Sequence, residues 1–216
     1  MKHIDTIELD VNSEWFNNTI TPIFEERATD SLSSQDLSDL IISTRNWFWM
    51  AMWDDEIINH VSSGAFILTI SNGEKLIGFS SIIDRLWIPY LVGIAIHSEY
   101  QKKGIYTQLH KDILQKKYEQ ILLRTQNKSV IQWAKKAGWE VFIGSEAWNQ
   151  MKDIIDNELF INECNGKNFK DGVIEGAYGA YLGSSDRVNY IDEAMYPGFQ
   201  AARGDSLLVL LRMPKE

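Results

Sequence analysis

The sequence predicts a layered α/β fold in which helices cover a sheet. The chain has 216 residues, 44% of them hydrophobic, which is enough to bury a large core without a disulfide or a metal. Apolar runs of strand length alternate with helical periodicity through residues 65–143, and this alternation is typical of helices packed on a sheet. No internal repeat or low-complexity linker divides the chain. We therefore expect one domain over residues 1–216.

The first half of the chain predicts a strand, two helices and a hairpin. Residues 3–10 alternate like a strand, and residues 12–29 carry apolar side chains at helical spacings. Ser34 is the expected N-cap of a helix over residues 35–52. The hairpin consists of strands 65–70 and 75–83, joined by a Ser-Asn-Gly-Glu turn.

The second half predicts alternating strands and helices followed by a long segment of weak pattern. We expect strands at 90–97, 120–124, 140–143 and 207–212 and helices at 104–118 and 128–137, the latter ending at Gly138. Residues 144–205 are rich in Gly, Asn, Asp and Tyr. A long weak segment before a strong strand predicts an insertion within one domain.

Charge and cysteine content narrow the cellular setting and the partners. The formal net charge is -9, which repels phosphates, so we expect neither nucleic-acid nor membrane binding. This acidity could attract a cationic acceptor such as an amine, or it could serve solubility alone. The single cysteine, Cys164, excludes an intrachain disulfide, and no signal-peptide core or membrane-length apolar run is present. We expect a cytoplasmic protein without a metal site.

The loop between the strand at 90–97 and the following helix has the composition of an anion site. A helix start leaves backbone N–H groups without intrahelical acceptors, and the helix dipole favours a bound phosphate there. Gly104 lets a ligand approach the backbone, and Lys102 and Lys103 add positive charge. An ordinary strand–helix loop can carry the same residues, so the loop alone does not decide the function.

The wider context of this loop resembles the core of the GNAT superfamily of acyl-CoA N-acyltransferases. Its loop motif is matched by Gln101-Lys102-Lys103-Gly104-Ile105-Tyr106, its helix-starting Asn by Asn127, and its Gly-aromatic pair by Gly138-Trp139. The resemblance is good over 65–143, fair over 1–64 and absent over 144–205. It implies a three-layer α/β fold whose mixed, largely antiparallel sheet is splayed at its parallel strand pair.

The resemblance also implies a cofactor and a reaction. Acetyl-CoA would be the co-substrate, and an amine-bearing acceptor would attack its thioester directly. The pyrophosphate would bind the backbone of the loop, the pantetheine arm would pair with the preceding strand, and Asn127 would face that arm. The implied cofactor-binding residues are Ile94, Ala95, Ile96, Gln101, Lys102, Lys103, Gly104, Ile105, Tyr106, Thr107 and Asn127. Many members of the superfamily are dimers, so a homodimer is possible.

Two positions depart from the family pattern. Tyr106 replaces the last Gly or Ala of the loop, and its side chain could either point away from the phosphates or fill their space. Ala134 stands where many members carry a Tyr as general acid. The catalytic groups therefore stay unassigned. The candidate acids, bases and nucleophiles, each with a plain structural alternative, are Asp84, His97, Glu99, His110, Glu163, Cys164, Glu175, Tyr178 and Tyr181.

An aromatic and acidic segment is the remaining candidate for the acceptor site. It consists of Trp47, Phe48, Trp49 and Trp53, followed by Asp54, Asp55 and Glu56. These residues could line an acceptor pocket, although core packing or a subunit contact explains the aromatics more simply, and a solvated helix end does the same for the acidic residues. Three functions follow from the sequence: an N-acyltransferase, an acyl-CoA-binding domain without turnover, and a protein-interaction module that uses residues 144–205.

Overall fold

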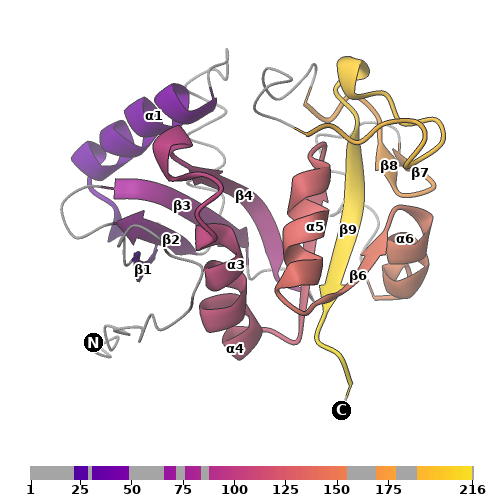
Figure 1. Cartoon of the computed structure of the whole chain (residues 1–216), viewed down its shortest axis with the longest axis horizontal. Coiled ribbons are helices and arrows are strands. Elements are labelled where there is room, and N and C mark those ends of the chain that lie inside the picture. Colours follow the sequence, from indigo (N-terminus) through magenta and orange to yellow (C-terminus); the bar gives the residue numbers. More distant parts are fainter. Residues whose placement is uncertain are drawn as a thin grey trace. The chain divides into compact units, whose positions relative to one another are not determined.

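The computed structural model describes residues 22–28, 31–48, 66–71, 76–83, 88–154, 169–178 and 189–215. The fold is mixed α/β with mostly antiparallel strands (Figure 1). The chain forms two compact units. Unit 1 contains Met1–Asp84 and Leu91–Leu109, and unit 2 contains Arg85–Tyr90 and His110–Glu216. A single domain over residues 1–216 stays a prediction.

Unit 1 is built on an antiparallel sheet. Strand β1 (Ile23–Ala28) pairs with β2 (Phe66–Ser71), which pairs with β3 (Leu76–Ile83). Strand β4 (Tyr90–Ile96) follows β3 in the sheet, and the pairing extends beyond its end, where the His97 N–H donates to the Ile77 carbonyl at 2.8 Å. The core of this sheet includes the buried side chains of Ile70, Ile77, Phe79, Ile82 and Ala95.

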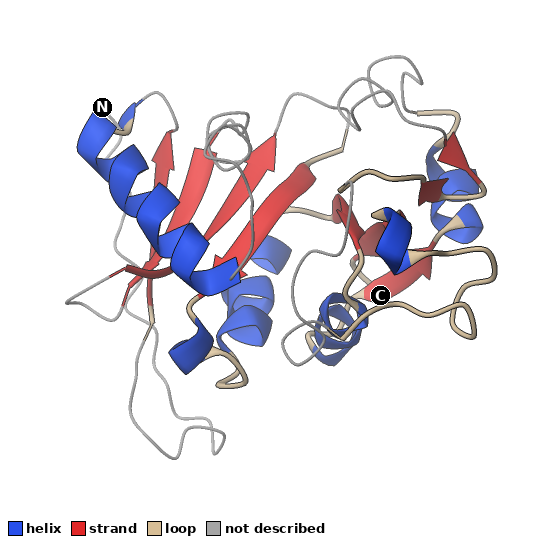
Figure 2. Ribbon diagram, turned by 90° about the horizontal axis from the view of Figure 1, so that it is seen from above, coloured by secondary structure: helices blue, strands red, loops and turns tan. Residues whose placement is uncertain are grey.

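The long helix α1 (Ser34–Phe48) lies over the sheet of unit 1 (Figure 2). It begins at Ser34, one residue earlier than expected, directly after Ser33, which forms a reciprocal pair with Asp36. The Asp36 N–H donates to Ser33 Oγ at 3.1 Å, and the Ser33 N–H donates to the Asp36 carboxylate at 2.9 Å. The Ser33 hydroxyl also donates to the Asp36 carboxylate at 2.7 Å, and this bond, followed by the one from the Ser33 N–H, lowers the pKa of Asp36. The N-cap is therefore Ser33 and not Ser34.

One element was predicted wrongly in this unit. The helical spacing of residues 12–29 predicts a helix, but residues 23–28 form β1. Phe24 is buried, whereas its neighbours Ile23 and Glu25 are exposed, which is the alternation of a strand. Tertiary pairing with β2 decides the conformation here, as it commonly does for short apolar segments. The predicted strand at 3–10 lies outside the described residues.

Unit 2 has a second group of strands around a central strand, β9 (Ser206–Arg212). Strands β5 (Gln120–Thr125) and β6 (Glu140–Ile143) both pair with it in antiparallel fashion. Two-residue strands β8 (Val173–Ile174) and β7 (Phe169–Lys170) extend the sheet from its first residues. All residues of β9 before Arg212 are buried, so this strand forms the centre of the unit's core.

The helices of the second half follow the predicted order. The expected helix at 104–118 is α3 (Ile105–Leu109), a π-helical turn η3 (His110–Leu114) and α4 (Gln115–Lys117). Helix α5 (Lys128–Lys136) follows β5 and buries Ile131 and Ala134. None of the described helices is both long enough and apolar enough to cross a lipid bilayer.

The segment 144–205 contains more regular structure than its sequence pattern suggests. It contributes α6 (Ser145–Met151), β7, β8 and the 3-10 turn η4 (Ala201–Arg203). The buried carboxylate of Asp205 stabilises the end of this segment. It accepts hydrogen bonds from the Gly176 N–H at 3.0 Å and the Gln200 N–H at 2.9 Å. The Arg203 guanidinium donates two more, at 2.7 and 2.6 Å. Burial alone would raise the pKa of Asp205, but these bonds outweigh it and lower that pKa.

Candidate functional site

The predicted anion loop connects β4 to α3 in unit 1. After β4 the chain makes a 3-10 turn, η2 (Ser98–Tyr100), in which the Tyr100 N–H donates to the His97 carbonyl at 2.8 Å. The side-chain amide of Gln101 then reaches back and donates to the Ile96 carbonyl at 2.9 Å. Gln101 therefore ties the loop to the end of β4.

The loop backbone has an unusual conformation at two of its residues. Lys102 has φ 63° and Gly104 has φ 78°, both in the left-handed region that a non-glycine residue enters at a cost. Left-handed residues within a turn rotate successive N–H groups toward one side and make anion-binding concavities. The first bond of α3 runs from the Gln108 N–H to the Gly104 carbonyl at 3.0 Å. At a helix start the first backbone N–H groups point away from the helix, where a ligand can accept them.

Positive charge lies at the same place. Lys102, Lys103 and Gly104 are all exposed. The Lys103 ammonium lies 5.2 Å from the centre of the buried Tyr100 ring, a cation–π contact that keeps it near the loop. Tyr100 was not among the expected site residues, and an aromatic residue just before two lysines was the available signal.

Tyr106 does not extend into solvent from the loop. Its residue is 5% exposed, and α3 also buries Ile105 and Leu109. Burial raises the pKa of the Tyr106 hydroxyl, so this group stays protonated at neutral pH. The ring thus belongs to the packed side of α3, whereas loop residues 102–104 are exposed.

The three residues of β4 that are expected to contact pantetheine direct their backbone groups to two different edges of the strand. A Cβ at Gly78 of β3 would lie 2.7 Å from the Ala95 carbonyl oxygen, so Ala95 presents its backbone to β3. Because backbone groups alternate along a strand, Ile94 and Ile96 present theirs to the opposite edge of β4. A glycine inside a strand often marks such a close backbone approach, and Gly78 was the signal for it.

Asn127, the expected contact in unit 2, is the N-cap of α5. Its side-chain oxygen accepts the Ser129 N–H at 2.9 Å, and its own N–H donates to Thr125 Oγ1 at 2.9 Å. This cap explains structurally why an Asn starts the helix. Contact between Asn127 and a cofactor arm stays a prediction.

The candidate acids and bases near the cofactor motifs have defined surroundings. His97 Nδ1 accepts the Glu99 N–H at 3.3 Å, and its ring packs edge-on against Tyr100 at 5.8 Å. His110 is fully buried in unit 2 and packs edge-on against Trp139 at 6.2 Å. Burial lowers the pKa of His110 to about 3, so it is neutral at pH 7. Ala134 is also fully buried and offers no acid.

The candidates from segment 144–205 are partly described. Glu175 forms an ion pair with Arg203 at 3.4 Å. The Tyr178 hydroxyl donates to the Arg124 carbonyl at 3.3 Å, and the Arg124 guanidinium lies 5.1 Å from the Tyr178 ring centre. The remaining candidates lie outside the described residues: Asp84, Glu163, Cys164, Tyr181, Trp49, Trp53, Asp54, Asp55 and Glu56, together with the side chains of Trp47 and Phe48.

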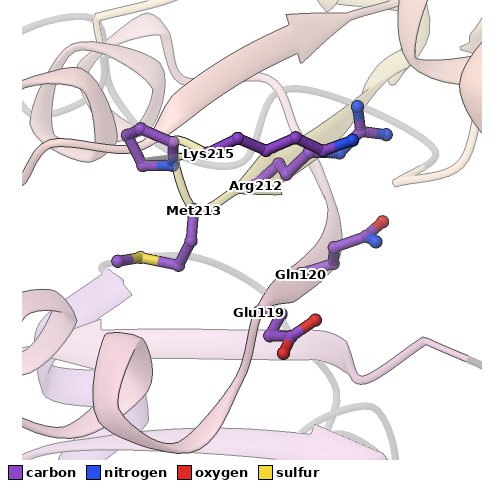
Figure 3. Close-up of a pocket in the computed structure, with 6 residues that line it drawn as sticks. Glu119, Gln120, Arg212, Met213 and Lys215 are labelled. Carbon is purple, nitrogen blue, oxygen red and sulfur yellow. The ribbon is translucent and has the colours of Figure 1, made fainter.

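A pocket of about 440 Å³ lies entirely within unit 2 (Figure 3). The residues that line it flank the start of β5 and the end of β9 and include none of the predicted site residues; they are Glu119, Gln120, Arg212, Met213, Pro214 and Lys215. Arg212 is held by a bond to Gln150 at 3.1 Å and by the Phe142 ring at 4.9 Å. Among the described residues, no cluster of His, Cys, Asp and Glu is suited to a metal ion.

Comparison with known families decides the family of the chain. Residues 26–139 match the model of the acetyltransferase (GNAT) family. This chain belongs to the acetyltransferase (GNAT) family. The match covers more than half of the 216 residues and includes β4, the predicted anion loop, Asn127 and Trp139. The predicted family is therefore confirmed, and segment 144–205 lies outside the matched region.

Solved structures of several acetyltransferases match this chain, and one of them reaches a TM-score of 0.50. The ribosomal-protein-S18-alanine N-acetyltransferase from Escherichia coli is 12% identical with a TM-score of 0.50, over 89% of this chain and 96% of that chain. A Bacillus subtilis acetyltransferase in complex with CoA is 18% identical with a TM-score of 0.45, over 88% and 98% of the two chains. An Elizabethkingia anophelis GNAT acetyltransferase with acetyl-CoA bound is 15% identical with a TM-score of 0.46, over 89% and 98%. No curated protein matches the sequence.

Proposed function

We propose that this GNAT protein transfers an acetyl or other short acyl group from CoA to an amine acceptor by direct attack. The observation that carries the proposal is the loop 101–107. Two left-handed residues, Lys102 and Gly104, precede a helix start, and the exposed residues Lys102 and Lys103 supply positive charge. Backbone N–H groups and cations together suit a pyrophosphate. Family membership supports acyl-CoA as the source of that pyrophosphate.

The roles of individual loop residues follow from their positions. Gly104, Ile105, Tyr106 and Thr107 would bind phosphate through backbone N–H groups, whereas Gln101 would act by holding the loop against β4. Tyr106 is compatible with this role because its ring is buried, and a backbone donor needs no particular side chain.

The edge of β4 opposite β3 would hold the pantetheine arm. Ile94 and Ile96 would supply the backbone groups, and Ala95 would contribute packing, since its carbonyl faces Gly78. A backbone N–H on this edge is also the donor proposed to polarise the thioester carbonyl and stabilise the oxyanion that forms when the amine attacks.

Collapse of that oxyanion breaks the C–S bond, releases CoA thiolate and leaves the amide. The attacking nitrogen loses its proton to solvent in the process. Ala134 cannot protonate the thiolate, so we propose that the thiolate leaves as such or takes a proton from solvent. The same residue favours the second candidate function, which is acyl-CoA binding without turnover.

Turnover separates these two functions. Purified protein would be incubated with acetyl-CoA and a panel of amines, and release of CoA thiol would be followed. S-acetyl-pantetheine, which lacks the pyrophosphate, is the matched control donor. We expect amine-dependent thiol release from acetyl-CoA and much weaker release from the control. Binding of acetyl-CoA without thiol release for any amine would favour the non-catalytic function, and equal use of both donors would contradict the role of the loop.

A further inference from the structure

The pocket of unit 2 is built where β5 begins and β9 ends. Gln120 lies opposite Arg212 in the antiparallel register of these strands, so their side chains leave the sheet on the same face. The pairing continues past Arg212, where the Met213 N–H donates to the Glu119 carbonyl at 2.8 Å. Backbone hydrogen bonds therefore hold both sides of the pocket, and its volume of about 440 Å³ is that of a small-molecule site.

Arg212 brings a positioned positive charge to this pocket. Its guanidinium lies 4.9 Å from the centre of the Phe142 ring and donates to the side-chain oxygen of Gln150 at 3.1 Å. A guanidinium that stacks on a ring uses its flat face and keeps the N–H groups at its edges for hydrogen bonds. Within the described part of the chain, no carboxylate pairs with Arg212. Its charge is therefore held in place but not neutralised.

A second observation on Arg212 points to a missing acceptor. Its Nε–H is buried and has no hydrogen-bond partner among the described residues. Buried donors in native proteins are nearly always paired, and an exception calls for a water, an ion or a ligand. In an arginine side chain, Nε and a terminal nitrogen form the edge that binds a carboxylate through two parallel hydrogen bonds. The unpaired Nε–H of Arg212 therefore indicates that a ligand in the adjoining pocket supplies the acceptor.

The other charges of the pocket narrow the kind of ligand. Lys215 adds a second cation, and Glu119 adds a carboxylate; both residues are exposed. Figure 3 shows Arg212 and Lys215 on one side of the pocket and Glu119 with Gln120 on the other. Two cations and one anion leave a single positive charge, which suits one carboxylate better than a doubly charged phosphate that Glu119 would repel. Glu119 and the Gln120 amide oxygen can accept a hydrogen bond from a hydroxyl or ammonium group on the same ligand.

We propose that this pocket binds a small hydroxy- or amino-carboxylate. The carboxylate of the ligand binds Arg212 and Lys215, and its hydroxyl or ammonium group donates to Glu119. Such a ligand bridges the start of β5 and the end of β9, so its binding stabilises the folded chain. None of the residues that would contact CoA lines this pocket, and the inference does not rest on the proposed acyl transfer.

The first test measures the melting temperature of the full chain with a panel of small hydroxy- and amino-carboxylates. Each acid is paired with its own amide, which keeps the size and the donor but lacks the negative charge, and sodium phosphate forms a third arm. We expect at least one acid to raise the melting temperature while its amide and phosphate do not. Titration calorimetry with the best acid should give a dissociation constant below about 1 mM.

Variants then place the bound acid in the pocket. Arg212→Gln should weaken binding at least about tenfold, and Lys215→Gln about threefold. Because Arg212 also packs on Phe142, the exposed Lys215 provides a test that does not depend on this packing. Lys136→Gln changes an exposed lysine at the end of α5 and is the matched control. Lys103→Gln, in the predicted anion loop, should also bind the acid as wild type does.

Three results would overturn the inference. The first is a panel in which no acid stabilises the protein more than its amide does. The second is stabilisation by phosphate that equals that of the best acid, which would show a general response to anions. The third is an unchanged affinity in both Arg212→Gln and Lys215→Gln, or a loss in Lys103→Gln, because either would place the bound acid elsewhere. Acyl transfer is tested separately by thiol release, so a failure of one proposal leaves the other standing.

Discussion

Two turns of this protein use the same left-handed backbone in opposite ways. In the loop after β4, Lys102 and Gly104 adopt positive φ, and both are exposed. At the start of α6, Gly144 (φ 56°) meets Gly172 (φ 80°), and a Cβ at Gly172 would lie 1.9 Å from the Gly144 carbonyl carbon. The first turn leaves its backbone open to a ligand, whereas the second uses the missing side chains for close packing.

The second turn is closed further by a tyrosine. The Tyr196 hydroxyl donates to the Asp171 carbonyl and accepts the Ser145 N–H, the latter at 2.8 Å. A Cβ at Gly144 would lie 2.1 Å from this hydroxyl oxygen. Positive φ alone therefore does not identify a binding site. Exposure and nearby charge distinguish the loop after β4 from a turn that serves packing.

The largest effect is expected from Gly172→Ala. The new Cβ overlaps backbone that cannot move away cheaply, and φ 80° adds strain, so unfolding free energy should fall by more than about 4 kcal/mol. Gly198→Ala is the matched control, because its φ of 81° is similar and no atom lies within 4 Å of the new Cβ. That variant should lose only about 1 kcal/mol. Urea denaturation measures both, and equal losses would contradict the packing account.

The next largest effect concerns the stability of the protein at acid pH and the fully buried His110. Its pKa of about 3 lies below the unfolded value of 6.5, so the unfolded chain binds the proton first as the pH falls. Stability is therefore retained above about pH 6.5 and lost below it, by about 1.4 kcal/mol per pH unit at most. Between pH 7 and pH 5 we expect a loss of about 2 kcal/mol.

His110→Leu should remove this dependence, since leucine fills the buried site without titrating. Denaturation curves at pH 7 and pH 5 for both proteins would measure the difference. Parallel losses in wild type and variant would show that another group governs acid stability.

A smaller effect is expected from the loop lysines. Lys102→Gln and Lys103→Gln should each weaken CoA binding about fivefold, or about 1 kcal/mol, because each removes a cation beside the proposed phosphate site. The losses should shrink at high salt. Lys116→Gln changes an equally exposed lysine on α4 and is the control. Titration calorimetry with CoA would measure the three affinities. Equal affinities of all three variants would show that Lys102 and Lys103 do not contribute to CoA binding.

The smallest effect concerns the loop backbone itself. Lys102→Gly should stabilise the protein by up to about 1 kcal/mol, because glycine adopts φ 63° without the steric cost. Gly104→Ala should act in the opposite direction by a similar amount. A stability loss on Lys102→Gly, measured by urea denaturation, would show that the left-handed strain is absent in solution.

Elements with a strong local pattern were predicted from the sequence, whereas elements that depend on tertiary packing were not. Strong periodicity and punctuation predicted β2 to β6, α1, α5, β9 and the loop after β4 to within a few residues. Helix α6 was missed because its N-cap, Gly144, makes no side-chain cap bond, and β7 and β8 have only two residues each. β1 was predicted as a helix because its apolar spacing suits a helix as well as a strand. Only the pairing with β2 decides between them.

Within the proposed site, the sequence indicates a kind of chemistry but not the geometry of the residues. Lysines and a glycine before a helix predict an anion loop. The left-handed φ of Lys102 and the burial of Tyr106, however, depend on packing that no local sequence pattern encodes. The pairing of Asn189 and Ile191 with the chain after β5 joins residues some sixty positions apart. Such non-local contacts leave no periodic trace in one sequence.

The central claim is that loop 101–107 is an open cradle for the CoA pyrophosphate. The most direct measurement is the melting temperature of wild type and of the Lys102→Gln, Lys103→Gln double variant, each with and without excess acetyl-CoA. At about a hundred times the dissociation constant, bound ligand stabilises by about 2.7 kcal/mol, a shift of several degrees. We predict this shift for wild type and a much smaller one for the double variant at the same concentration. No shift in wild type, or equal shifts in both proteins, would contradict the claim.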